Sequence, residues 1–168
     1  MTRTLILLSL FLTLSLEALC QNYVVIGESS YPSTEIFKLR SNADVNFIND
    51  LNLIFAKDGE QAVLIVRSAL VSTVRISGEV LIELEDKSVI TCTKKGQKEN
   101  IDGFASTEYK LTKEDLALLK KSNIQTVNYQ IKCADCSRNL LYEGKYSASN
   151  KGDSAINFVE RLNDFYGE

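Results

Sequence analysis

Apolar and polar residues alternate along several segments of this chain, a spacing of two that predicts β-strands. From Val127 to Cys133 every second residue is apolar, and the positions between them are polar. A second segment, from Val74 to Leu84, is apolar at most even positions and carries Gly78 near its centre. This segment is either one long strand that bulges at Gly78 or two strands that turn there.

A β-hairpin is predicted between residues 51 and 70. Two apolar, β-branched runs, 51–56 and 61–70, are separated by a connection that contains Asp58 and Gly59. Asp-Gly favours a tight hairpin turn, because such turns need positive φ angles that glycine adopts freely. The second run is almost continuously apolar, which indicates a central strand covered on both faces.

The rest of the chain predicts short strands, loops and turns. Residues 27–34 and 94–103 are rich in small, polar or charged residues and read as exposed loops. The shorter strands are expected at 23–26, 35–40, 88–93, 105–111 and 140–147.

Two helices are predicted. Thr112 is a suitable N-cap and Asp115 completes a capping box, so a helix over 113–121 is expected. Near the end of the chain, Asp153 is the expected cap of a second helix, and Gly167 stands where a helix commonly ends. Its apolar face has the spacing of an amphipathic helix and consists of Ala155, Phe158, Val159, Leu162 and Phe165.

These elements together predict an α+β fold. Many strands joined by tight turns indicate a mainly antiparallel β-sheet or sandwich. One short helix is inserted between strands, and the C-terminal amphipathic helix is expected to pack on one face of the sheet.

The first twenty residues have the composition of a signal peptide. Arg3 is followed by an apolar run that is too short for a comfortable transmembrane helix, and cleavage is expected before Gln21. Residues 1–20 are therefore predicted to be a signal peptide, and residues 21–168 a single β-rich domain in the periplasm or outside the cell. The alternative is a lipid anchor on Cys20.

Composition limits the chemistry that this chain can perform. It contains no histidine among its 168 residues, which removes histidine bases, histidine-activated nucleophiles and most catalytic zinc sites. The net charge of −3 is spread evenly, and no basic patch suited to nucleic acid is evident. We therefore expect no catalytic residues, no cofactor, no metal and no nucleic-acid partner.

The segment from Ile82 to Ile131 has a recurring order of elements. A strand, a turn, a strand that ends in Cys92 and a polar loop precede the pattern Tyr-x-Leu-Thr-x-Glu-Asp-Leu-x-x-Leu and a further strand. This order resembles small exported β-rich domains of unknown function from bacteria. The resemblance covers about a third of the chain and implies export and a β-rich fold, without an assigned activity.

Cys92, Cys133 and Cys136 are the disulfide candidates, because an exported protein meets an oxidising compartment. Cys92 and Cys133 both fall on the apolar side of predicted strands, which favours their pairing slightly over Cys133–Cys136. The alternative is a thiol-disulfide oxidoreductase that uses the Cys133-x-x-Cys136 motif. A metal site on these thiols is a third, weaker interpretation.

The sequence therefore predicts a non-catalytic exported module that binds a partner or has a structural role and is stabilised by one disulfide. The partner is unknown, and an envelope protein or a small ligand would both fit. Clustered carboxylates at Glu83, Glu85 and Asp86 are expected to be a solvated turn. Tyr23, Tyr31, Tyr129 and Tyr142 are expected mainly to pack.

Overall fold

The computed structural model describes residues 22–43, 49–70, 74–93, 95–101, 103–133, 143–152 and 155–167. For residues 95 and 97–101 it describes the backbone alone. The predicted signal peptide, Cys20, Cys136 and Tyr142 lie outside the described residues.

Eleven strands form one antiparallel sheet in the described part of the chain. Its order is β7-β6-β10-β11-β3-β4-β5-β9-β8, and the β1–β2 hairpin joins it through β4. The mainly antiparallel sheet expected from the sequence is confirmed. The strands are β1 (Asn22–Ile26), β2 (Ser29–Ser33), β3 (Phe37–Ser41), β4 (Leu51–Asp58), β5 (Gln61–Ala69), β6 (Val74–Leu84), β7 (Val89–Cys92), β8 (Lys95–Ile101), β9 (Phe104–Lys110), β10 (Ile124–Cys133) and β11 (Gly144–Ser149).

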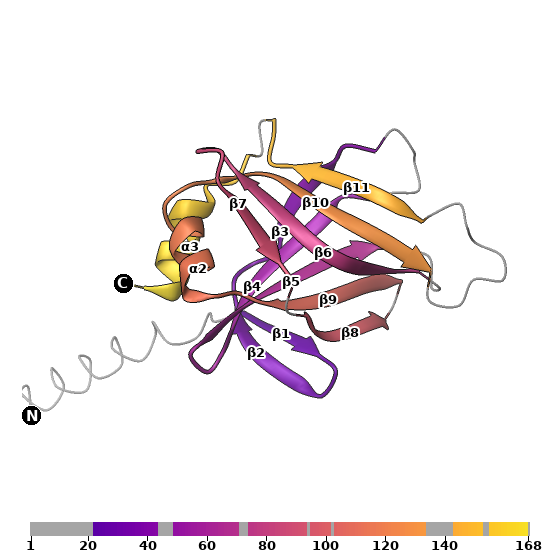
Figure 1. Cartoon of the computed structure of the whole chain (residues 1–168). Coiled ribbons are helices and arrows are strands. Elements are labelled where there is room, and N and C mark those ends of the chain that lie inside the picture. The colour runs from indigo at the N-terminus through magenta and orange to yellow at the C-terminus, as the bar shows by residue number, and fades with distance from the viewer. Residues whose placement is uncertain are drawn as a thin grey trace, which may run out of the picture.

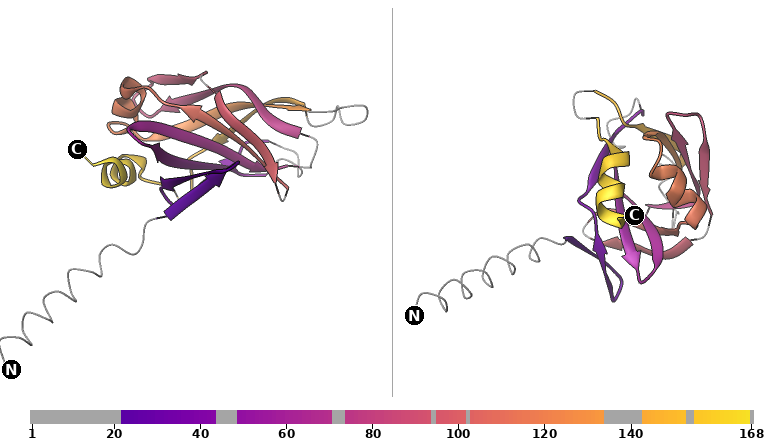
Figure 2. Two further views of the ribbon diagram at one scale, coloured as in Figure 1. Left: turned by 90° about the horizontal axis from the view of Figure 1, so that it is seen from below. Right: turned by 90° about the vertical axis from the view of Figure 1, so that its left-hand side faces the viewer.

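The sheet curls back on itself, as the two views in Figure 2 show. β6 and β9 approach each other across the interior although they are not paired in the ladder. The hydroxyl of Thr107 donates to the carbonyl of Ile76 at 2.9 Å, and the hydroxyl of Tyr109 donates to the carbonyl of Gly78 at 3.2 Å. Side chains of β9 therefore donate hydrogen bonds to backbone carbonyls of β6, although the two strands are not paired.

Alternating residues of β4 and β5 contribute to two different hydrophobic cores. Leu53 and Leu64 belong to the main core inside the curl. Ile54 and Ile65 point the other way, into a smaller core covered by the β1–β2 hairpin, to which Ile26 contributes. Burial on both faces explains why the sequence of β5 is almost continuously apolar, as predicted.

Two helices, α2 (Lys113–Leu119) and α3 (Phe158–Tyr166), lie together at one end of the curled sheet (Figure 1). α2 begins with the predicted capping box: Thr112 accepts from the backbone of Asp115, whose side chain accepts from the backbone of Thr112. α3 buries Phe158 and Leu162. Both helices place apolar residues on the end of the main core.

Two segments predicted to be loops are strands. β2 pairs with β1, and β8 pairs with β9 at an end of the sheet. Strands of this kind are held by backbone hydrogen bonds and need no apolar alternation. Their polar residues therefore concealed them in the sequence.

Three other expectations were resolved by the structure. Residues 74–84 form a single strand, with a register irregularity opposite β10 and a positive φ of 78° at Gly78. The C-terminal helix starts at Phe158 with Asn157 as its cap, whereas Asp153, the predicted cap, lies outside the described residues. β11 runs from Gly144 to Ser149, and residues 140–142 of the predicted strand lie outside the described residues.

Candidate functional site

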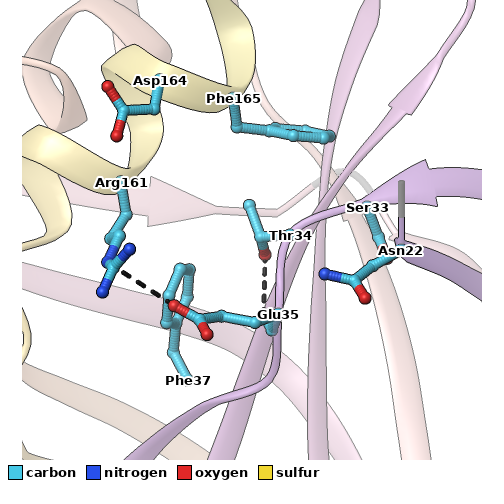
Figure 3. Close-up of a pocket in the computed structure, with 8 residues that line it drawn as sticks. All are labelled: Asn22, Ser33, Thr34, Glu35, Phe37, Arg161, Asp164 and Phe165. Atoms are coloured by element: carbon cyan, nitrogen blue, oxygen red, sulfur yellow. Dashed lines mark hydrogen bonds and ion pairs between the residues drawn. The ribbon is translucent and has the colours of Figure 1, made fainter. Parts of the chain in front are cut away.

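A cleft of about 390 Å³ opens between α3 and the junction of β2 with β3 (Figure 3). It is formed by elements that approach from different sides of the cleft. A second hollow, of about 610 Å³, is lined only by residues of β6, β10 and β11. The cleft is lined by Asn22, Ser33, Thr34, Glu35, Phe37, Arg161, Asp164 and Phe165.

The strand side of the cleft is anchored to β4. Thr34 donates its backbone N–H to the carbonyl of Phe55 at 2.8 Å, and its hydroxyl accepts from the Phe55 N–H at 3.1 Å. The same hydroxyl donates to the carbonyl of Glu35 at 2.9 Å. Phe37 is only 3% exposed and forms part of the lining. This side of the cleft is therefore fixed by main-chain bonds and by the core.

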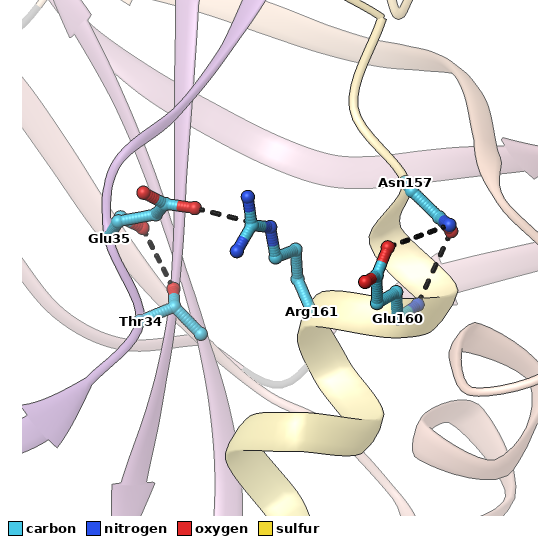
Figure 4. A network of polar contacts seen from close by, with 5 residues as sticks. All are labelled: Thr34, Glu35, Asn157, Glu160 and Arg161. Atoms are coloured by element: carbon cyan, nitrogen blue, oxygen red, sulfur yellow. Dashed lines mark hydrogen bonds and ion pairs between the residues drawn. The ribbon is translucent and has the colours of Figure 1, made fainter.

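α3 supplies the opposite side. Arg161, Asp164 and Phe165 are spaced i, i+3 and i+4, so they lie on one face of the helix. The helix is capped by Asn157, whose side-chain oxygen accepts from the Glu160 backbone at 3.3 Å (Figure 4).

Further contacts hold α3 against the sheet. The ring of Phe158 meets that of Phe37 edge-on, with 5.1 Å between centroids. At the other end of the helix, the hydroxyl of Tyr166 donates to the carbonyl of Ala56 at 2.9 Å. Both ends of α3 are thus tied to the strands, so the cleft has a defined width.

The cleft contains charged groups of both signs. Arg161 Nε lies 3.5 Å from a carboxylate oxygen of Glu35, and the two side chains are 56% and 57% exposed. This ion pair engages Nε and leaves the two terminal nitrogens of the guanidinium unpaired within the described part of the chain. Asp164 likewise has no polar side-chain partner among the described residues. The cleft thus offers two guanidinium nitrogens with free N–H donors and an unpaired carboxylate one helical turn apart, within the described part of the chain.

Cys92 is a free cysteine that is 2% exposed, so the expected Cys92–Cys133 disulfide is not found. Burial raises the pKa of the Cys92 thiol to about 12, and the carboxylate of Asp115 adds to this shift. Cys92 falls on the apolar side of its strand because it packs in the main core, and not because it forms a disulfide with Cys133. Because its thiol stays protonated and covered, Cys92 is not a nucleophile.

Cys133 ends β10 and is disulfide-bonded. Its partner lies outside the described residues, since no disulfide joins two cysteines of the described part of the chain. The backbone N–H of Cys133 donates to the carboxylate of Glu143 at 2.9 Å. The described residues on the N-terminal side of the Cys-x-x-Cys motif form a strand.

The carboxylates and tyrosines singled out from the sequence form no catalytic or metal-binding cluster among the described residues. Glu83 accepts from Asn128, and hydrogen bonds from Ser88 lower the pKa of Asp86. Tyr129 is 2% exposed and packs in the main core, whereas Tyr23 is exposed. Within the described ranges, no group of three or more His, Cys, Asp or Glu residues could hold a metal ion.

Sequence reasoning missed the cleft. Glu35 and Arg161 lie near opposite ends of the chain, and only the packing of α3 brings them together. The available signal was local: Arg161 and Asp164 share a polar face of a helix whose other face is apolar.

The comparisons with known proteins add no family. No protein-family model matches the chain, and the searches of curated proteins and of solved structures find no match either. Among the described helices, none is long and apolar enough to cross a membrane.

Proposed function

We propose that this protein is a non-catalytic, exported binding module and that the cleft beside α3 takes a small zwitterionic ligand with an apolar group. Export is supported by the composition of residues 1–20. A disulfide at Cys133 supports a stabilising bridge and an oxidising compartment.

The observation that carries the proposal is the presence, on one face of α3, of unpaired guanidinium nitrogens of Arg161 and an unpaired carboxylate of Asp164 within the described part of the chain. The two terminal nitrogens of Arg161 can form a bidentate pair of hydrogen bonds with a carboxylate. Asp164 stands three residues further along α3, where side chains lie about 5–6 Å apart at their Cβ atoms, and can accept from an ammonium. The lining holds two carboxylates, Glu35 and Asp164, and one guanidinium, Arg161, which disfavours a purely anionic ligand, whereas a zwitterion meets groups of both signs.

The size and lining of the cleft favour a compact ligand. Its volume of about 390 Å³ equals the share of liquid occupied by roughly a dozen water molecules. Phe165, which is half-buried, supplies aromatic surface for an apolar group. An amino acid with a large apolar side chain, or the end of a peptide, has this combination of groups.

Calorimetric titration of the purified protein with L-phenylalanine tests the proposal. N-acetyl-L-phenylalanine, which lacks the ammonium, and L-phenylalanine amide, which lacks the carboxylate, are the matched probes. We expect Arg161→Met and Asp164→Asn each to weaken binding by about tenfold, since a hydrogen bond to a charged group contributes roughly 1.5–3 kcal/mol. Arg75→Met, an exposed arginine on β6, is the control.

These variants should fold, because an exposed ion pair such as Arg161–Glu35 contributes at most about 1 kcal/mol to stability. Equal binding of phenylalanine and both blocked forms would contradict the zwitterion assignment. Binding that is insensitive to Arg161 and Asp164, or no binding at all, would contradict the cleft as the site.

The alternative function, a thiol-disulfide oxidoreductase, would use the bridge at Cys133. It predicts that the protein reduces or oxidises a test disulfide and loses that activity in Cys133→Ser. A bridge that withstands mild reductant and an inactive protein favour the binding module.

A further inference from the structure

We propose that a positively charged hollow where β3 meets the segment after β11 binds an oxyanion, namely the phosphate, sulfate or carboxylate group of a small ligand. The hollow has a volume of about 320 Å³. None of its lining residues belongs to the cleft beside α3, so the two sites are separate. It is lined by Lys38, Arg40, Asp50, Asn150, Lys151 and Ile156.

The strand pairing brings the basic residues together. Lys38 and Arg40 are two residues apart on β3, so both point to the same face of the sheet, and both are exposed. In the pairing of β3 with β11, Arg40 lies opposite Ser149, the last residue of β11. Lys151 follows two residues after Ser149, which carries it to the same edge of the hollow.

The segment after β11 is held in place by Asn150. The side-chain oxygen of Asn150 accepts from the Ile156 N–H at 2.8 Å, and its amide donates to the Ile156 carbonyl at 2.9 Å. These two bonds hold Asn150, the residue next to Lys151, against Ile156. A side-chain carbon at Gly152 would lie 3.9 Å from a terminal nitrogen of Arg40, so the guanidinium rests close to this segment.

Only one of the basic groups is neutralised. Lys38 lies 3.3 Å from the carboxylate of Asp50, which also accepts from the Ser41 N–H at 2.9 Å. The Arg40 guanidinium has no hydrogen bond or ion pair with any residue of the described chain.

Lys151 also has no carboxylate partner among the residues that the structure describes. Its ammonium donates at 2.5 Å to the neutral amide of Asn42. Asn42 in turn donates to the hydroxyls of Ser147 at 3.0 Å and Ser149 at 2.8 Å. The lysine is therefore positioned by a network of neutral groups.

The chemistry of these groups selects an oxyanion. Arginine presents a planar fork that matches two oxygens of a carboxylate, phosphate or sulfate, and lysine adds a point charge. The hollow thus holds two cations without a carboxylate partner in the described ranges, in a chain whose net charge is −3. A cationic ligand would be repelled from this hollow.

Thermal unfolding and calorimetric titration test the site, with sodium phosphate, sulfate and acetate compared against chloride at equal ionic strength. We expect at least one oxyanion to raise the melting temperature of the unmodified protein above its value in chloride and to give a measurable dissociation constant. A response to acetate but not to phosphate or sulfate would assign the site to carboxylates, and the reverse would assign it to tetrahedral anions.

The variants decide whether the effect comes from this hollow. Arg40→Met and Lys151→Met should each weaken the anion by roughly tenfold or more, and Arg40→Lys, which keeps the charge but loses the fork, should fall between them and the unmodified protein. Arg75→Met, also an exposed arginine on a strand, should bind normally. If Arg40→Met does not fold, Lys151→Met carries the test.

Sulfate and phosphate also stabilise proteins without binding, because they are excluded from protein surfaces. An equal rise in melting temperature for all variants would therefore overturn the proposal. The absence of any oxyanion effect would overturn it as well.

Discussion

The hydroxyl of Thr107 on β9 donates a 2.9 Å hydrogen bond to the main-chain carbonyl of Ile76 on β6. These two strands are not neighbours in the ladder, yet both Thr107 and Ile76 are fully buried. A buried carbonyl without a partner is costly. This side-chain bond therefore helps to keep the curl of the sheet closed around its core.

We expect Thr107→Val, which keeps the shape of the side chain, to lower the free energy of unfolding by about 1–3 kcal/mol. Denaturant titration measures this change. Thr91→Val, at an exposed position on β7, is the matched control and should alter stability by less than about 0.5 kcal/mol. Equal effects of the two substitutions would show that the bond does not hold the curl.

A cluster of three aromatic rings joins α3 to the sheet. Phe158 lies 5.1 Å from Phe37 and 6.3 Å from Phe55 between ring centroids, and all three side chains are buried. We expect Phe158→Ala to cost about 3–5 kcal/mol, and Phe158→Leu clearly less, because leucine refills part of the volume. Thermal or denaturant unfolding checks the order of the two. An unfolding free energy of Phe158→Ala equal to that of the unmodified protein would contradict the role of Phe158 in joining α3 to the sheet.

The buried thiol of Cys92 predicts a loss of stability at alkaline pH. Its pKa is raised from 9.0 to about 12 in the folded protein. Below pH 9 both the folded and the unfolded chain keep this proton, so the thiol has no effect. Between pH 9 and 12 the unfolded chain releases the proton and the folded chain does not, so the free energy of unfolding falls as the pH rises.

For one such group the slope approaches about 1.4 kcal/mol per pH unit. The unfolding of Cys92→Ala, measured from pH 8 to 11, should therefore show a shallower decline than that of the unmodified protein. Burial also raises the pKa of Tyr109, Tyr129 and Tyr166, so part of the decline remains. Identical slopes in the two proteins would contradict the buried, protonated thiol.

The sequence predicted those parts of the fold in which local chemistry and burial agree. The hairpin between β4 and β5, the two-sided burial of β5 and the capping box at Thr112 were all predicted from nearby residues, and each is present. The hairpin turn itself is formed by Gly59 and Glu60 and not by Asp58 and Gly59, and of its two residues Gly59 has a positive φ, of 60°. β2 and β8 were missed because backbone pairing holds them and their side chains carry little apolar alternation.

The candidate site depends on distant residues, and for that reason it could not be predicted. Glu35 lies close to Arg161 because the packing of Phe158 places α3 beside the junction of β2 and β3. The cysteines show the same limit. Cys92 and Cys133 both lie on the apolar side of their strands. Cys92 is nevertheless a free core residue, and Cys133 forms a disulfide with a different partner.

The most direct test of the binding module is a nuclear magnetic resonance titration of the isotope-labelled protein with L-phenylalanine. The proposed function predicts progressive, saturable shifts of the amide signals of Glu35, Arg161, Asp164 and Phe165, with Arg75 and β8 unchanged. The same titration of Arg161→Met should leave these signals in place. Shifts that cluster on another face of the sheet, or no shifts at all, would contradict a ligand site beside α3.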